Sequence, residues 1–379
     1  MNIELDEPTN TLLGERVGVV HIGTDSIRIP GAMISNTEIN YGAKIAETYK
    51  LNFRYLNEVH EIKKWYGMHK IAKIFGSQEE RENHVEWIKT EVGRAHSLSK
   101  SVLSMYTPLI PPGHVLNSGL IRSFVELQID AGLTVVNIPD SPAITLDKMS
   151  TIIADMAKLI SKSDKTAFYL LPINNDPYEF RDRIDMAKNN VKGITAAITS
   201  PIADMKVHFA NFNTLSELRS NPNIVRVLSN MDRTIDRSHQ GAFYPQSFLV
   251  SDLYSSKLGY PPKKSSSSSS SSPIYKYLDE RSMGYMSFQQ YVDEIGKTLN
   301  CDCPVCVDNK IDDLSVEYSE EMISALRVHE AHVVYRYNEQ IKAMIISDKL
   351  KEFIGQKKFA LETIQSTYLS NLSMKQTIL

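Results

Sequence analysis

Three cysteines, the only ones in this chain of 379 residues, fall within six positions, in the run Cys301-Asp302-Cys303-Pro304-Val305-Cys306. Thiolates at this spacing on a tight loop can converge on one ion, and three cysteines with one histidine form a usual closed ligand set for zinc. The segment 319–342 is expected to be a helix that carries His329 as the fourth ligand and His332, one turn later, as its rival. Because four protein ligands leave no position for water, we predict one structural Zn²⁺, with a redox thiol cluster as the alternative.

A second group of polar residues follows short apolar runs between positions 100 and 256. Apolar runs of this length, alternating with amphipathic stretches, are typical of parallel strands joined by helices, and their number favours a (β/α)8 barrel over a doubly wound sheet. The active site of such a barrel lies at the carboxyl ends of the strands. The polar residues expected there are Asp140, Asn174, Asn175, Asp176, Thr199, Ser200, Asn230, Asp232, Arg233 and Asp252, the last at the end of a strand over 247–251.

A helix N-cap is the alternative interpretation for each of these residues, since Asp, Asn and Ser are the usual caps. Asp140-Ser141-Pro142 and Asn175-Asp176-Pro177 both look like caps. Two carboxylates at one barrel mouth, Asp140 and Asp252, can instead divide the roles of nucleophile and base recognition.

The predicted fold class is α/β: a (β/α)8 TIM barrel with an N-terminal β-hairpin and helical elaboration and a C-terminal zinc-binding helical subdomain. The expected boundaries are 1–100 for the elaboration, 101–260 for the barrel core, 261–297 for a flexible serine-rich connector and 298–379 for the zinc-binding subdomain with the C-terminal helices. The runs 16–22 and 26–35 predict the hairpin, and 42–100 is expected to be helical. Eight serines, 265–272, cannot pack a core and predict a mobile loop.

The totals limit the partners and the compartment. With a net charge of −3, any polyanion must be met by a local basic patch. No apolar run is long enough for a transmembrane helix, and the acidic N-terminus lacks a signal-peptide core, so no membrane association is expected. Clustered cysteines without partners elsewhere favour a reducing cytoplasm, which would be the host cytoplasm for a viral protein.

The cysteine spacing, a barrel before it and a helix carrying His329 together resemble the tRNA-guanine transglycosylase superfamily. In that family Cys-x-Cys-x-x-Cys and a later histidine bind a structural zinc on a subdomain at the end of a (β/α)8 barrel. The resemblance covers about residues 100–345, with weaker matches at 120–140, 168–183 and 248–256.

This resemblance implies base exchange, in which an aspartate attacks the anomeric carbon of a guanosine nucleotide and a 7-deazaguanine replaces guanine. Asp140 matches the base-recognising aspartate and Asp252 the nucleophile, although another register places Ser255 there. The other substrate-binding candidates are Asn174, Asn175, Thr199, Ser200 and Tyr106, the last as a stacking partner. The run 103–113 lacks the aspartate that acts as general acid and base in the family, so this group is missing or comes from elsewhere.

Among these enzymes the chain is most like the divergent DNA-guanine transglycosylases (DpdA-like) of phages and bacteria, because no separate tRNA-binding module is recognisable. The implied partners are DNA and a base such as 7-cyano-7-deazaguanine; the assembly state, for which a homodimer is one option, is open. Candidate nucleic-acid contacts are Lys263, Lys264, Arg233, Arg237, His239 and Arg336. The alternatives are a tRNA-guanine transglycosylase and a non-catalytic, nucleic-acid-binding subunit of such an enzyme.

Overall fold

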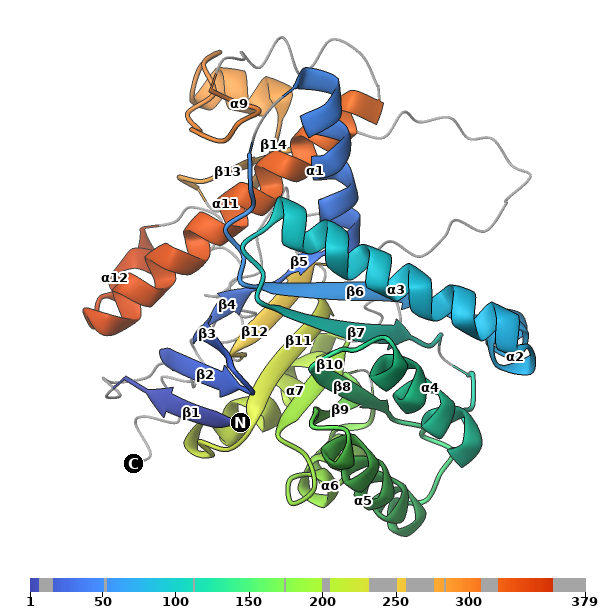
Figure 1. Ribbon diagram of the computed structural model, residues 1–379. Coiled ribbons are helices and arrows are strands. Elements are labelled where there is room, and N and C mark those ends of the chain that lie inside the picture. The colour runs from blue at the N-terminus through green and yellow to red at the C-terminus, as the bar shows by residue number, and fades with distance from the viewer. Residues whose placement is uncertain are drawn as a thin grey trace, which may run out of the picture. The chain divides into compact units, whose positions relative to one another are not determined.

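The computed structural model describes residues 1–6, 16–50, 53–111, 113–173, 175–199, 205–231, 251–256, 276–282, 284–307 and 320–356 (Figure 1). The chain divides into two units. The first consists of residues 1–36, 56–231 and 246–257, and the second of residues 37–55, 232–245 and 258–379. The polar residues predicted for the barrel fall mainly in the first unit, and the cysteine segment falls in the second.

A nine-stranded sheet with parallel neighbours forms the centre of the first unit. In hydrogen-bonding order its strands are β4 (Gly31–Ala32), β12 (Leu253–Ser256), β11 (Val225–Met231), β10 (Gly193–Ala197), β9 (Thr166–Pro172), β8 (Val135–Pro139), β7 (Leu103–Leu109), β6 (Val59–Trp65) and β5 (Ile34–Ser35). β4 and β5 stand at opposite ends of this order, but only Met33 separates them in the chain. The sheet is therefore nearly closed, which confirms an α/β fold with a barrel-like parallel sheet, consistent with a TIM-like barrel.

A small antiparallel sheet of β1 (Asn2–Leu5), β2 (Gly18–Ile22) and β3 (Asp25–Ile29) packs against the amino ends of the barrel strands. Its residues Val20 and Ile27 share one buried cluster with Val59, Leu103 and Leu253, each at or near the start of its strand. The predicted hairpin is present as β2 and β3. The predicted run 26–35 is split, because its last residues leave the hairpin and become the barrel strand β4/β5.

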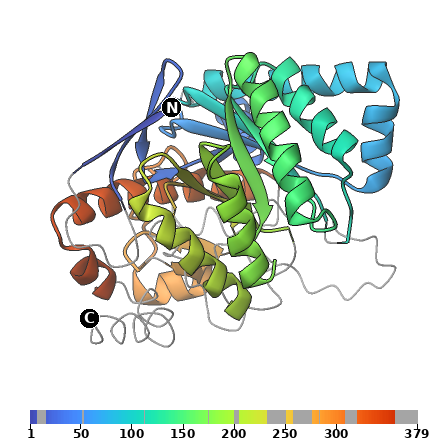
Figure 2. The ribbon, with the colours of Figure 1, turned by 90° about the horizontal axis from the view of Figure 1, so that it is seen from below.

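Helices follow the strands and lie along the outside of the barrel, as α4, α5 and α6 do beside β8 and β9 in Figures 1 and 2. They are α2 (Met68–Gly76), α3 (Gln78–Leu98), α4 (Ser118–Asp130), α5 (Leu146–Lys162), α6 (Pro177–Ala187), α7 (Met205–Glu217) and the short η1 (Leu218–Ser220). Asp176 caps α6 by accepting the N–H groups of Tyr178 and Glu179, as predicted. Asp140 is no cap, because the N-cap of α5 is Thr145.

Two expectations about the first hundred residues are wrong. The segment 42–100 is not wholly helical, because it contains β6, and the barrel begins near residue 31 and not at 101. β6 is hard to recognise as a strand from the sequence because it contains charged residues, among them Glu61 and Lys63. Its residues Val59, Glu61, Lys63 and Trp65 nevertheless recur with a period of two and share one face of the strand.

The second unit includes α1 (Asn36–Tyr49) from Thr37 onward, the antiparallel hairpin of β13 (Lys276–Asp279) and β14 (Gly284–Ser287), and the helices α9 (Phe288–Glu294), α11 (Glu320–Ile346) and α12 (Leu350–Gly355). An ion pair between Lys44 and Glu320 joins α1 to α11. The predicted connector 261–297 therefore contains β13, β14 and α9, while its serine run lies outside the described residues. None of the described helices combines the length and apolar character needed to cross a bilayer.

Candidate functional site

A buried carboxylate, Glu61, lies inside the barrel. The hydroxyl groups of Thr107 on β7 and Ser229 on β11 each donate a hydrogen bond of 2.5 Å to Glu61 Oε1, so the carboxylate bridges strands that are not neighbours in the sheet. Glu61 Oε2 accepts no hydrogen bond and lies 3.6 Å from Lys63 Nζ. One oxygen is thus anchored, and the other has only an ion-pair contact.

Lys63 extends this group of polar residues toward β12. Its side chain is 1% exposed, and Nζ donates to Ser255 Oγ at 3.1 Å. Ser255 Oγ also accepts the backbone N–H of Asn230 at 3.1 Å. We call Glu61, Lys63, Thr107, Ser229 and Ser255 the interior cluster. The sequence points only to Ser255, as the alternative nucleophile position; for Glu61 and Lys63 the available signal is the alternation of β6.

Asp140 follows β8 directly, at the carboxyl end of the barrel strands, as predicted. Its Oδ1 accepts hydrogen bonds from Tyr169 Oη at 2.6 Å and from Arg183 Nη1 at 2.7 Å. Burial raises the pKa of Asp140 above its usual value, against the opposing effects of Arg183 and Tyr169. Its Oδ2 is buried and accepts no hydrogen bond.

Asn175 lies in the loop after β9, the next strand of the barrel, and is also buried. Its Nδ2 has no hydrogen-bond acceptor. Asn211 on α7 holds this loop, because its Nδ2 donates to the carbonyl oxygens of Ile173 at 2.6 Å and Asn175 at 2.9 Å. Asn211 Oδ1 itself lacks a donor. Asp140, Asn175 and Asn211 thus leave three buried polar atoms unpaired around the carboxyl ends of β8 and β9. We call these three residues the mouth group.

Thr199 and Tyr106, two other predicted substrate contacts, lie in different places. Thr199 follows the carboxyl end of β10, where it was expected, and is 7% exposed. Tyr106 is misplaced for stacking on a base, because it is fully buried and its hydroxyl pairs with Tyr66 and His84 of α3. The alternation of β7, which directs Met105 into the buried core and Thr107 toward Glu61, turns Tyr106 to the outer face of the sheet. Asn174 and Ser200 lie outside the described residues.

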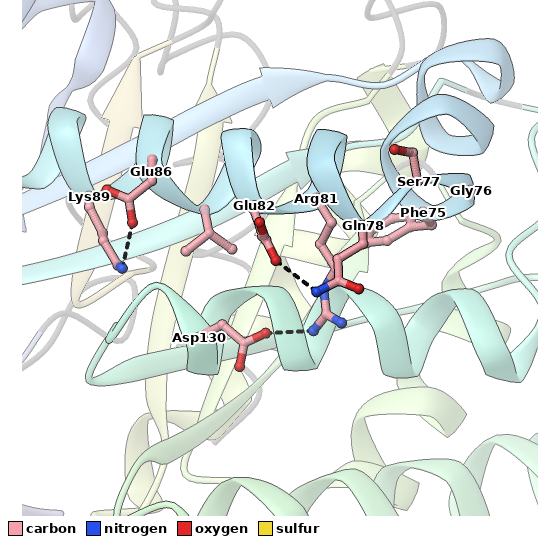
Figure 3. Close-up of a pocket in the computed structure, with 10 residues that line it drawn as sticks. Phe75, Gly76, Ser77, Gln78, Arg81, Glu82, Glu86, Lys89 and Asp130 are labelled. Atoms are coloured by element: carbon pink, nitrogen blue, oxygen red, sulfur yellow. Dashed lines mark hydrogen bonds and ion pairs between the residues drawn. The ribbon is translucent and has the colours of Figure 1, made fainter.

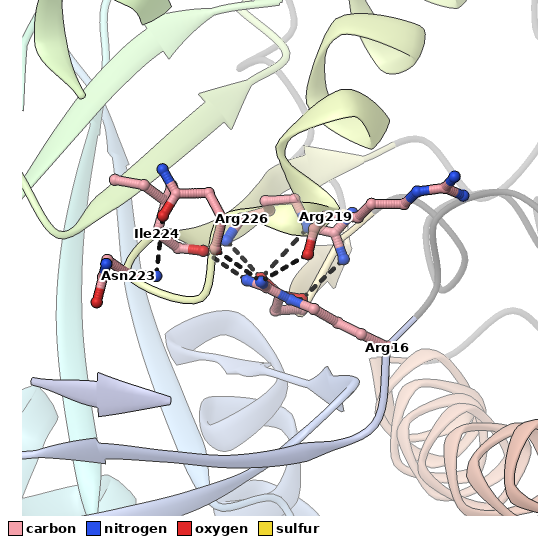
Figure 4. Close-up of polar contacts among 7 residues, drawn as sticks. Arg16, Arg219, Asn223, Ile224 and Arg226 are labelled. Atoms are coloured by element: carbon pink, nitrogen blue, oxygen red, sulfur yellow. Dashed lines mark hydrogen bonds and ion pairs between the residues drawn. The ribbon is translucent and has the colours of Figure 1, made fainter. Parts of the chain in front are cut away.

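The position predicted for Asp252 is also wrong. Residues 247–250 lie outside the described part of the chain, and Asp252 directly precedes β12, so it stands at the amino end of the barrel. Both carboxylate oxygens are taken: Oδ1 by Arg16 Nε at 2.7 Å and Arg226 Nη2 at 2.9 Å, and Oδ2 by Arg16 Nη2 at 2.5 Å and the Arg226 N–H at 2.7 Å. Arg16 also donates to backbone carbonyls beside Arg226, as Figure 4 shows.

The electrostatics of Asp252 agree with a structural ion cluster. Burial alone would raise the pKa of Asp252, but Arg226 and Arg16 together lower it well below its usual range. A carboxylate whose two oxygens are both held by arginines has no free position for attack, and it lies at the end of the barrel opposite the usual active site. The geometry therefore gives no support to Asp252 as the nucleophile.

The predicted nucleic-acid contacts fall mostly in parts of the chain that the structure does not describe: Lys263, Lys264, Arg233, Arg237 and His239. Arg336, on α11, is described and pairs with Asp302 and, at 3.2 Å, with Glu280. Its guanidinium is partly exposed, so a further contact with a phosphate is sterically open.

In the second unit the three cysteines and His329 come together as predicted. All four are buried, and one ligand atom from each lies within 4.8 Å of the others. His329 Nδ1 lies 3.3 Å from Cys306 Sγ and 3.6 Å from Cys303 Sγ. His332 stays outside this set, although it lies near Cys301, and its Nε2 pairs with Asp302 at 3.1 Å.

The surroundings of the cysteine cluster suit a cation. His329 Nε2 lies 2.9 Å from the carbonyl oxygen of Leu278, which assigns the ring proton to Nε2 and leaves the lone pair of Nδ1 toward the sulfurs. Hydrogen bonds from Cys301 and Cys306 lower the pKa of the Cys303 thiol below its usual value. Tyr277 stacks on the His329 ring at 4.1 Å. The cluster can therefore hold one metal ion with its histidine fixed in orientation.

A surface groove of about 870 Å³ lies between α3 and the ends of α2 and α4 (Figure 3). Charged and amide side chains line it, and they pair with one another, as Arg81 does with Asp130 and Lys89 with Glu86. It lies on the outside of the barrel helices and includes no member of the interior cluster or the mouth group.

Comparison of the chain with protein-family models and with curated proteins finds no match.

Proposed function

We propose that this protein is a base-exchange transglycosylase that replaces guanine in DNA by a 7-deazaguanine base, such as 7-cyano-7-deazaguanine. The observation that carries the proposal is the mouth group, which leaves buried polar atoms unpaired at the carboxyl ends of β8 and β9. An unpaired buried polar atom costs about 1–3 kcal/mol. A ligand that supplies the missing partners would recover this free energy on binding.

The unpaired atoms complement the polar edge of guanine. Guanine offers N–H donors at N1 and at the 2-amino group and acceptors at O6 and N7. Asp140 Oδ2 and Asn211 Oδ1 are acceptors, and Asn175 Nδ2 is a donor. A 7-deazaguanine keeps the N1, N2 and O6 groups, so one site can release guanine and accept its analogue. A base within a duplex would first have to be flipped out of the stack.

We assign the cysteine cluster to one structural Zn²⁺, held by Cys301, Cys303, Cys306 and His329. Three sulfurs and one ring nitrogen are a usual donor set for zinc, and these four ligand atoms lie within 4.8 Å of one another. The metal would cross-link the loop 301–306 to α11 and take no part in base exchange. Elemental analysis should find one zinc per chain, and Cys303→Ser should lose it together with the folded second unit, whereas His332→Ala should keep it.

DNA is the proposed substrate, with tRNA as the alternative that a direct assay separates. The protein is incubated with 7-cyano-7-deazaguanine and either duplex DNA or tRNA, and the nucleosides are analysed by mass spectrometry. We expect the modified deoxynucleoside in the DNA arm. Modified nucleoside in tRNA alone would make the protein a tRNA enzyme, and its absence from both would refute base exchange.

A non-catalytic subunit is a second candidate, favoured by one observation: Asp252 is locked between two arginines and cannot act as a nucleophile. This candidate predicts that the purified chain binds DNA but forms no covalent adduct with it.

A further inference from the structure

The interior cluster presents Glu61 as a carboxylate with one anchored and one unpaired oxygen. Thr107 and Ser229 both donate to Oε1, and Lys63 Nζ stands 3.6 Å from Oε2. Two fixed hydroxyl donors orient the group, and the Lys63 ammonium lies beside its second oxygen. Oε2 keeps its lone pairs free of hydrogen bonds. A carboxylate that is fixed in orientation and keeps one oxygen free of hydrogen bonds can act as a nucleophile.

The cluster lies nearer to the barrel mouth than the position of residue 61 in β6 suggests. Thr107 and Ser229 each stand two residues before the ends of their strands, β7 and β11, and Ser255 stands one residue before the end of β12. Because these three side chains make the contacts of the cluster, the long side chain of Glu61 reaches the upper interior of the barrel.

Ser255 is a poor alternative nucleophile for an exchange reaction. A serine attached to the anomeric carbon would form an ordinary glycosidic ether, whose alkoxide is a poor leaving group. A carboxylate forms an acyl-linked glycosyl intermediate that a second nucleophile can displace, as in retaining glycosidases. Ser255 is also engaged by Lys63 and by the Asn230 N–H. It is therefore suited to hold Lys63 beside Glu61.

We infer that Glu61 is the nucleophile that carries the covalent intermediate; this inference rests on the proposed base exchange. Glu61 Oε2 bonds to C1′ of deoxyguanosine as the C1′–N9 bond breaks, and the electron pair goes to guanine N9, which takes a proton from water and leaves. N9 of the incoming 7-deazaguanine then bonds to C1′, gives its proton to water, and the electron pair of the C1′–Oε2 bond returns to the carboxylate.

Entry of the nucleotide requires movement above the cluster. Glu61 is fully buried, and so is Leu109, the next residue after Thr107 on the inward face of β7. The nucleotide must displace side chains of this layer to bring C1′ to Oε2. The reaction should therefore depend on binding of the flipped nucleotide, and small electrophiles alone should not modify Glu61.

The direct test locates the covalent bond. The full-length protein is incubated with duplex DNA without incoming base, the adduct is isolated under denaturing conditions, and tandem mass spectrometry of the digested protein finds the deoxyribosyl group. We expect it on Glu61. A deoxyribosyl group on another residue, such as Ser255 or Asp252, overturns the inference and leaves the proposed base exchange standing.

Three variants distinguish a loss of catalysis from a loss of folding. Glu61→Gln should lose the adduct and base exchange by at least about 1,000-fold while keeping its melting temperature within a few degrees. In Glu61→Ala, added azide should restore guanine release and give a deoxyribosyl azide, an effect that a structural role does not produce. Glu91→Gln is the matched control, since Glu91 is a buried glutamate with an unpaired Oε2 outside the barrel, on α3.

The outcomes distinguish this inference from the function on which it rests. If wild-type protein exchanges the base and Glu61→Gln, folded, does so equally well, Glu61 is not the nucleophile but base exchange holds. If wild-type protein exchanges no base in DNA or tRNA, both fail.

Discussion

Buried carboxylates at the two ends of the barrel differ in how completely their oxygens are paired. At the amino end, Asp252 has every oxygen paired with Arg16 or Arg226. At the carboxyl end, Asp140 and Asn175 leave atoms without partners, and below them Glu61 leaves one oxygen with only an ion-pair contact. Satisfied buried charges hold a structure together, whereas unsatisfied ones lower its stability and raise its capacity to bind a ligand. Carboxylates of similar burial in one barrel can therefore have separate tasks.

Removing the Asp252 carboxylate should have the largest effect on stability. Asp252→Ala leaves two buried guanidinium groups without their carboxylate, so we expect a loss of about 3–5 kcal/mol in the free energy of unfolding, measured by urea denaturation. The matched control is Asp130→Ala, whose ion pair with Arg81 is partly exposed and should contribute at most about 1 kcal/mol. An Asp252→Ala protein of normal stability that has lost base exchange would return Asp252 to the list of catalytic candidates.

The two aspartates should also respond to pH with opposite signs. The lowered pKa of Asp252 means that the unfolded chain binds more protons there, so its stabilising effect is present above about pH 4 and is lost as the pH falls through the lower folded value. The raised pKa of Asp140 means that the folded chain holds its proton longer, so its effect on stability becomes less favourable as the pH rises from about 4.

These signs are measured as differences from Asp252→Asn and Asp140→Asn, so that pH effects common to all three proteins cancel. The stability advantage of wild type over Asp252→Asn should shrink below about pH 4. Wild type should become less stable relative to Asp140→Asn as the pH rises above that value. Equal slopes for both variants would contradict the contrast between the two ends.

The smallest expected effect concerns Asn211, which positions the loop of Asn175. Asn211→Leu removes two hydrogen bonds to backbone carbonyls and should cost about 1–3 kcal/mol of stability. It should also weaken binding of the base, measured as a raised KM with a smaller change in kcat. Asn213→Leu, at an exposed position of the same helix, serves as the control. Unchanged KM in Asn211→Leu would mean that the loop does not contact the base.

Local and strongly periodic features were predictable from the sequence. The spacing of Cys301, Cys303 and Cys306 and the helix of His329 define a compact set whose ligands the structure brings together. The barrel-like α/β fold and the position of Asp140 after β8 follow from short apolar runs between amphipathic helices. In each case one short segment, or one repeated pattern, contains the necessary information.

Features that depend on register and on long-range pairing were not predictable. A shift of a few residues in the last strand moved Asp252 from one end of the barrel to the other. Glu61 and Lys63 suggested a helix, because a charged strand is stable only when partners from distant strands satisfy it, and Ser229 and Ser255 lie more than 160 residues away. The cap expected at Asp140 failed for a related reason, since Tyr169 and Arg183 hold its carboxylate.

The most direct test of the central claim, that the unpaired atoms at the carboxyl end hold a base, is equilibrium binding of 7-cyano-7-deazaguanine by titration calorimetry. Wild type and Asp147→Asn, which changes an exposed carboxylate at the start of α5, should bind one base per chain, and Asp140→Asn should bind at least about tenfold more weakly. Equal affinity in wild type and Asp140→Asn would contradict the account.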